Sequence, residues 1–128
     1  MGYVVVQNSW EYDDDGYNLE EGGTPLSYFK TKEAAEEERE KLEIGKVEDL
    51  SRDSSWYGFA GYVHENINQE KLFNFVVKNF NPNWKKDLDI YETPFVPTDL
   101  NVVQLEMLTH YLNREGMVFY CVVEVEDK

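Results

Sequence analysis

Carboxylates recur at every second residue in one short stretch near the N-terminus. Glu11, Asp13 and Asp15 are followed by Gly16. This pattern begins a calcium-binding loop, because alternating carboxylates can approach one hard cation and glycine permits the turn. Such a loop closes with a bidentate Glu, but that position holds Gly22 and the nearest Glu is one residue out of place. We therefore predict no metal site here and interpret the stretch as a solvated hairpin turn or a partner-binding loop.

The same stretch has the composition of a protein interface. Trp10 precedes the acidic run, and Trp is favoured at interfaces because it offers a large contact area with little loss of entropy. Function in small domains is often carried by such surface turns. We therefore predict that the partner-binding residues include Trp10, Glu11, Asp13, Asp14 and Asp15.

A second acidic group follows with helical spacing. Glu36, Glu37 and Glu40 lie on a segment that should be a helix, with Glu43 also facing water. Regularly spaced carboxylates can steer a basic protein or imitate a row of phosphates. The alternative is that they form only the solvated face of the helix. We include the first three among the predicted partner-binding residues.

An aromatic segment with glycines supplies the last candidates. Trp56 and Tyr57 precede Gly58 and Phe59, with Tyr62 shortly after. Such rings can form an interface or complete a small core. We predict partner binding for Trp56 and Tyr57 and keep the core as the alternative.

Residues that could act as nucleophiles are few. His64, His110 and Cys121 could in principle form a nucleophile or a metal site. The thiol, however, falls on the apolar face of a predicted strand, where a buried and inert cysteine is expected. The Gly-x-Ser-x-Gly, phosphate-loop, Cys-x-x-Cys and His-Glu-x-x-His motifs do not occur in the sequence. We expect no cofactor, and this pattern favours a protein that is not an enzyme.

Composition and charge limit the class of protein. The chain has 128 residues, of which 41% are apolar, so a single domain over residues 1 to 128 can bury a real core. Acidic residues outnumber basic ones by 26 to 12, for a net charge of −14. This charge opposes direct binding to nucleic acid or to an anionic membrane, and the field is strongest in the first 50 residues.

Targeting features are missing from the sequence. The apolar run over residues 3 to 6 is too short for a signal peptide, and no run of about 20 apolar residues could cross a bilayer. A single cysteine, Cys121, cannot form an internal disulfide. We therefore expect a cytoplasmic location.

The elements that must position these residues follow from periodicity and capping. Strands are predicted at residues 3 to 10 and 117 to 125, with a short one at 26 to 29. Helices are predicted at 31 to 44, capped by Thr31 and ended by Gly45, and at 69 to 80, capped by Asn68. A third helix is predicted at 99 to 112, capped by Thr98 and ended by Gly116. Residues 46 to 66 are as consistent with a strand as with a loop, and residues 84 to 97 are predicted to be irregular.

These elements predict an α+β fold with a mainly antiparallel sheet that includes both terminal strands and is covered by two or three helices. The function that fits best is a stoichiometric binding protein for a basic partner, of the inhibitor, immunity or nucleic-acid-mimic type. Alternatives are a small enzyme or ligand-binding domain that uses Glu11, Asp13 or His64, and a structural subunit whose charge only maintains solubility.

Overall fold

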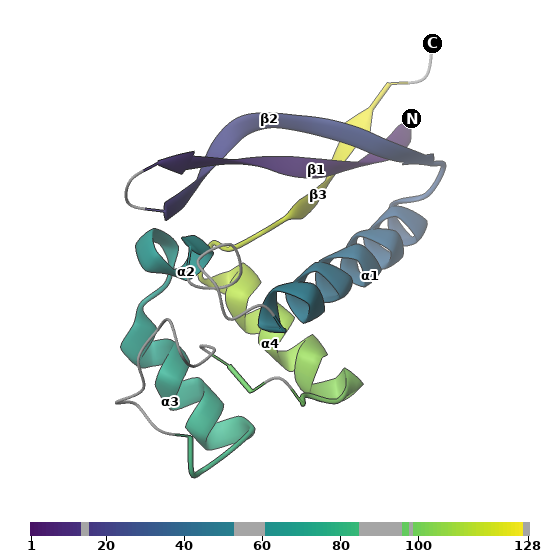
Figure 1. The fold of residues 1–128 in the computed structure, drawn as a ribbon. Helices are drawn as coiled ribbons and strands as arrows, with labels where there is room; N and C mark the ends of the chain where they lie inside the picture. The colour runs from purple at the N-terminus through teal and green to yellow at the C-terminus, as the bar shows by residue number, and fades with distance from the viewer. Residues whose placement is uncertain (14–15, 53–60, 85–95, 98, 127–128) are drawn as a thin grey trace.

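The computed structural model describes residues 1–13, 16–52, 61–84, 96–97 and 99–126. Its elements are, in chain order, β1 (Gly2–Asp13), β2 (Gly16–Phe29), α1 (Lys32–Ser51), α2 (Gly61–Asn66), α3 (Gln69–Asn79), α4 (Val102–Arg114) and β3 (Tyr120–Val125). Figure 1 shows the strands as one layer with the helices gathered beneath it. The predicted α+β architecture is therefore confirmed.

The sheet is antiparallel and has the order β2-β1-β3. Both terminal strands lie in this sheet, as predicted, and the N-terminal strand is at its centre with the C-terminal strand at one edge. The hairpin between β1 and β2 closes with Asp13 paired to Gly16, which confirms the predicted reversal after the acidic run.

Strand β2 is longer than the predicted strand at 26 to 29. The prediction interpreted the Gly22-Gly23-Thr24-Pro25 stretch as a break, but β2 continues through it. Register shifts opposite Val5/Val6 and Asn8/Ser9 accommodate this stretch as irregularities in the ladder. A proline is tolerated there because β2 is an edge strand.

Helix α1 also exceeds its prediction. The Thr31 cap is confirmed, since its Oγ1 accepts a hydrogen bond from the Ala34 N–H at 3.2 Å. The predicted stop at Gly45 is wrong, because the helix continues to Ser51. Val47 and Leu50 are buried in the core, and their burial outweighs the cost of about 1 kcal/mol for a glycine inside a helix.

The later helices begin and end through local chemistry. Asn68 caps α3, as predicted. Thr98, the predicted cap of the next helix, lies outside the described residues, and α4 is capped instead by Asn101, which forms a capping box with Gln104. Gly116 ends this helix as predicted, because its φ of 97° is a left-handed conformation that glycine adopts without strain.

The main core lies between the distal half of the hairpin and the helices. Its fully or nearly buried members include Val47, Val63, Leu72, Val76, Leu108, Leu112, Met117 and Phe119. In the stretch left open by the sequence, residues 46 to 51 complete α1 and residues 61 to 66 form α2. Tyr62 of α2 is buried and stacks on Tyr17 of β2, with ring centroids 4.3 Å apart. For Tyr62, the core alternative is the one observed.

A buried carboxylate joins α1 to the start of β3. Glu43, predicted to face water, is instead fully buried. Its Oε1 accepts from the Phe119 N–H at 2.8 Å, and its Oε2 accepts from the Tyr120 N–H at 2.9 Å. Asn113 donates to Oε1 at 3.1 Å, and an Arg39 nitrogen lies 3.9 Å from Oε2. Burial raises the pKa of Glu43 above its usual 4.5, although these hydrogen bonds and Arg39 act to lower it.

Candidate functional site

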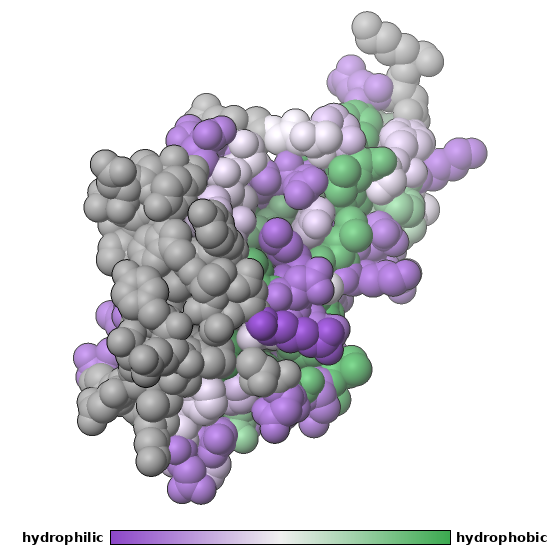
Figure 2. All heavy atoms as spheres, viewed as in Figure 1, coloured by the Kyte–Doolittle hydropathy of each residue, from purple (hydrophilic) through white to green (hydrophobic). Residues whose placement is uncertain are grey.

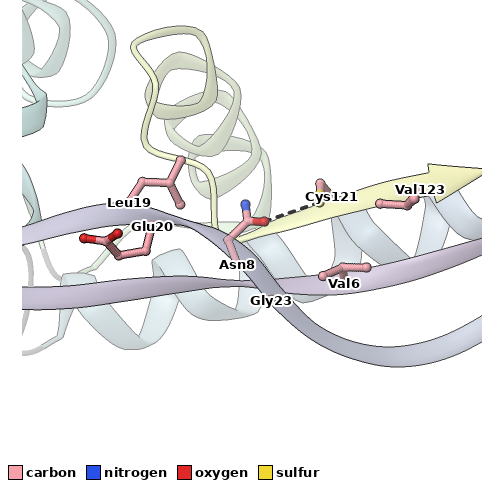
Figure 3. A pocket seen from close by; sticks show the side chains of 7 residues that line it. All are labelled: Val6, Asn8, Leu19, Glu20, Gly23, Cys121 and Val123. Atoms are coloured by element: carbon pink, nitrogen blue, oxygen red, sulfur yellow. Dashed lines mark hydrogen bonds between the residues drawn. The ribbon is translucent and has the colours of Figure 1, made fainter.

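An apolar groove crosses the face of the sheet that the helices leave uncovered. It encloses about 490 Å³ and receives side chains from all three strands, as Figure 3 shows. We call it the sheet groove and define it by its lining residues, which are Val6, Asn8, Leu19, Glu20, Gly23, Cys121 and Val123. A hollow of this size falls within the range of small-ligand or side-chain pockets.

The alternation of the strands explains why these residues share one face. Val5 points to the helix side and is fully buried, in the layer where α1 contacts β1. The next residue, Val6, therefore points to the opposite face. It pairs with Cys121 across the ladder, and Val4 pairs with both Val123 and Tyr28. Directly opposed residues lie on the same side of a sheet, so these residues of the three strands share one face. The groove extends from them to Leu19 and Glu20 of β2, beside the register irregularity between Asn8 and Ser9.

Large apolar side chains remain exposed on this surface. Leu19 and Tyr28 are each 48% exposed, and Val123 is 44% exposed. In the orientation of Figure 1, Figure 2 shows hydrophobic side chains reaching the surface at the end of the sheet that carries β3 and the chain termini. Single exposed apolar residues are ordinary, but a contiguous apolar patch beside a groove is typical of an interaction site.

A hydrogen-bonded pair lies in the groove. The Cys121 thiol donates to Asn8 Oδ1 at 3.3 Å, and Asn8 Nδ2 donates to the Val118 carbonyl at 3.0 Å (Figure 3 draws the first bond). Burial raises the pKa of the thiol, and the carboxylate of Glu43 adds to the rise, while Arg39 opposes it. A protonated thiol is a weak nucleophile, so this geometry suits binding better than covalent chemistry. The thiol was expected to be buried, but it is half-buried in the groove.

We expect Cys121 to react slowly with alkylating reagents in the folded protein. Because its pKa is raised, the thiolate should form only at a pH above that needed in the unfolded chain, which the rate of iodoacetamide labelling against pH would show. The urea-unfolded chain is the control, since it holds the same single cysteine. A folded-state midpoint at or below the unfolded one would contradict the prediction.

Among the predicted interface residues of the hairpin, Trp10 packs against the core. It is partly buried against the core, with its ring 5.4 Å from Tyr62 and 5.5 Å from Phe119 between centroids. Its indole N–H donates to the Val118 carbonyl at 3.2 Å. These contacts give Trp10 a structural role whether or not it also touches a partner.

The other predicted residues of the hairpin are located only in part. Glu11 is exposed on β1, between Trp10 and the turn. The backbone of Asp13 ends β1, but its side chain lies outside the described residues, as do Asp14, Asp15, Trp56 and Tyr57. The alternative enzyme site of Glu11, Asp13 and His64 stays a prediction, because the side chain of His64 also lies outside them.

The three predicted carboxylates of α1 are not equivalent. Glu36 is half-exposed and forms an ion pair with Arg39 at 3.3 Å. Glu37 is exposed, and Glu40 is bonded to His110 of α4 at 2.9 Å. Glu37 and Glu40 both line a second hollow of about 330 Å³, together with Glu106 of α4. This hollow is separate from the sheet groove.

Sequence reasoning missed Leu19, Tyr28 and Val123 as candidate site residues. A signal was present, because residues 4 to 6 and 122 to 123 are consecutive valines and so place apolar side chains on both faces of their strands. Such a strand is expected when both faces are covered. The sequence predicted helices mainly on one face of the sheet, but it did not show which face they cover.

Comparisons with known proteins add no family or neighbour. No protein-family model matches the chain, and no curated protein or solved structure shows significant similarity to it. Within the described part of the chain, none of the helices is both long and apolar enough to span a bilayer.

Proposed function

We propose that this chain is a cytoplasmic protein-binding module that binds one basic partner protein stoichiometrically, as an inhibitor, immunity protein or nucleic-acid mimic does. The observation that carries the proposal is the uncovered apolar face of the sheet around the sheet groove. An exposed apolar surface of this kind, rimmed by polar residues, is typical of a protein-protein interaction site.

Charge selects the kind of partner. The net charge of −14 repels acidic proteins and accelerates encounters with basic ones. Within the groove, Glu20 is exposed beside Leu19, so an arginine or lysine of the partner can pair with Glu20 while a neighbouring apolar side chain enters the groove. An apolar centre with a charged rim is the usual anatomy of a protein interface.

The two features act at different steps of binding. Exposed carboxylates, including those of the acidic turn, steer the partner and so increase the association rate. Burial of Leu19, Tyr28 and Val123 then slows dissociation, because most differences in affinity arise from the dissociation rate.

Site-specific photo-crosslinking in the cells that carry the gene would test the proposal. A photoreactive residue at Val123 should give one crosslinked partner of high isoelectric point, and the same residue at Val103 should not. Val103 is the matched control because it is also apolar and is 66% exposed, but it lies on α4. The crosslink at Val123 should be lost in Leu19→Asp.

Kinetics with the isolated partner would test the charge component. Replacing Asp13, Asp14 and Asp15 by Asn should slow association, and the difference from wild type should shrink as salt rises, because exposed charges are screened beyond about 8 Å at physiological ionic strength. The same crosslinked species at Val123 and Val103, or no species at Val123, would refute the sheet groove as the interface.

A further inference from the structure

Outside the sheet groove, three possible metal ligands meet where α1 and α4 contact each other. Glu106 and His110 are four residues apart on α4, so they lie one above the other on the same face of the helix. Glu40 reaches them from α1, and its Oε1 lies 2.9 Å from His110 Nε2. One ligand atom from each of the three residues lies within 4.8 Å of the other two. We call Glu40, Glu106 and His110 the interhelix triad.

The surroundings of the triad are negative and open. The adjoining hollow is lined by three carboxylates and a single ammonium group among the described residues, namely Glu37, Glu40, Glu106 and Lys41, together with Ile44. Side chains of Glu40 and His110 are 41% and 50% exposed. A divalent cation could therefore reach the triad without any opening of the fold, and its charge would be favoured there.

We propose that the interhelix triad binds a borderline divalent metal ion, with Zn²⁺ as the best match. One imidazole nitrogen and two carboxylate oxygens are ligands that zinc accepts at bond lengths of about 2.0 to 2.2 Å, which places tetrahedral ligand atoms about 3.4 Å apart. Glu40 Oε1 and His110 Nε2, which are 2.9 Å apart, would separate slightly to reach that spacing. The three ligand atoms already lie within 4.8 Å of one another, so rotations of these side chains are enough. Water from the hollow would complete the coordination as a fourth ligand.

Other cations fit this site less well. Calcium takes six to eight oxygen ligands, and magnesium requires nearly ideal octahedral oxygen coordination, so an imidazole with two carboxylates suits neither ion. A simple ion pair between His110 and Glu40 would explain their contact, and helical spacing alone brings Glu106 near His110. Zinc titration distinguishes this ion pair from a metal site. The site was not predicted from the sequence, because Glu40 and His110 are 70 residues apart.

Calorimetric titration with zinc chloride, together with the thermal unfolding midpoint, tests the proposal on the full chain. We expect one zinc ion per chain and a higher midpoint with zinc, because a bound ion would link α1 to α4. His110→Ala and Glu106→Gln should each weaken zinc binding by about tenfold or more, since even residues that only support metal ligands contribute 10- to 100-fold.

Three matched variants separate the triad from other sources of zinc affinity. His64→Ala removes the only other histidine, Cys121→Ser removes the only thiol, and Glu37→Gln removes a carboxylate of the same hollow that is outside the triad. All three should keep wild-type zinc affinity. Circular dichroism checks that each variant is folded, and the exposed position of Glu106 keeps Glu106→Gln informative even if His110→Ala unfolds.

Several results would overturn the proposal. They are the lack of zinc binding by wild type, wild-type affinity in both triad variants, or an equal loss of affinity in Glu37→Gln. An equal effect of calcium at the same concentration would also overturn it, because it would show general attraction of cations to an acidic surface. The outcome does not depend on the partner-binding proposal, which concerns the opposite side of the sheet.

Discussion

Replacing Glu43 by Ala should lower the free energy of unfolding by about 3 to 5 kcal/mol. The carboxylate is fully buried and accepts hydrogen bonds from the backbone N–H groups of Phe119 and Tyr120. Without it these donors lose their partner at the point where β3 begins, and Arg39 loses a neighbouring charge. Because small domains are stable by only about 5 to 15 kcal/mol, the loss should be obvious in urea unfolding followed by circular dichroism.

Glu36→Ala is the matched control for this prediction. Glu36 lies on the same helix and also pairs with Arg39, at 3.3 Å, but its side chain is 46% exposed. An exposed ion pair contributes little, so this variant should lose about 0.5 kcal/mol or less. A loss in Glu43→Ala no larger than that in Glu36→Ala would show that water replaces the buried carboxylate without penalty.

The pH dependence of stability tests the protonation of Glu43 separately. Its folded-state pKa is raised above 4.5, so its contribution is fully present below the unfolded pKa and is lost as the pH rises through the folded pKa. The stability of wild type relative to Glu43→Gln should therefore increase as the pH falls from 7 toward 4.5. Other carboxylates titrate in both proteins, and the difference between the two cancels them. A difference that stays constant with pH would contradict the raised pKa.

Trp10→Ala should give the second large effect, a loss of about 2 to 4 kcal/mol in the free energy of unfolding. The indole packs against the rings of Tyr62 and Phe119, and its removal leaves a cavity between the hairpin and α2. We place the loss slightly below that of a fully buried Trp because Trp10 is only partly buried. Chemical denaturation with a constant slope against denaturant would measure it.

Trp10→Phe distinguishes packing from hydrogen bonding at this position. It keeps a ring against the core but removes the bond from the indole to the Val118 carbonyl. That carbonyl still accepts from Asn8 Nδ2, so the loss should be about 1 kcal/mol. If Trp10→Ala were as stable as wild type, the packing of the ring would contribute nothing to stability. The predicted role of Trp10 in partner binding would then be the first function to test.

The two stability predictions also guide tests of function. Variants at Trp10 and Glu43 are expected to destabilise the fold, so their loss of partner binding would say little about the interface. Leu19 and Val123 are the better positions, because both are nearly half exposed and can be changed without opening a cavity. The acidic turn joins β1 to β2, and these two strands line the sheet groove together with β3. One partner can therefore contact both the charges of the turn and the apolar side chains of the groove.

The sequence alone determined the elements that depend on near neighbours. Thr31 and Asn68 cap their helices through the backbone three residues ahead, and Gly116 ends α4 through its own φ. These interactions are visible in a short window of sequence because both partners lie within it. The alternation of the terminal strands likewise placed both of them in one sheet.

Tertiary structure decided everything that depends on distant partners. From the sequence, Glu43 was expected to be a solvent-exposed carboxylate of the helix. Its burial involves the segment at Phe119, 76 residues later, whose N–H donates to the carboxylate just before β3 begins. Helix α1 passes Gly45 because Val47 and Leu50 meet the core. Valines on both faces of β1 and β3 could not reveal which face stays open, since that depends on where the helices pack. The candidate groove and the interhelix triad both arise from such long-range packing, which local propensity and periodicity do not encode.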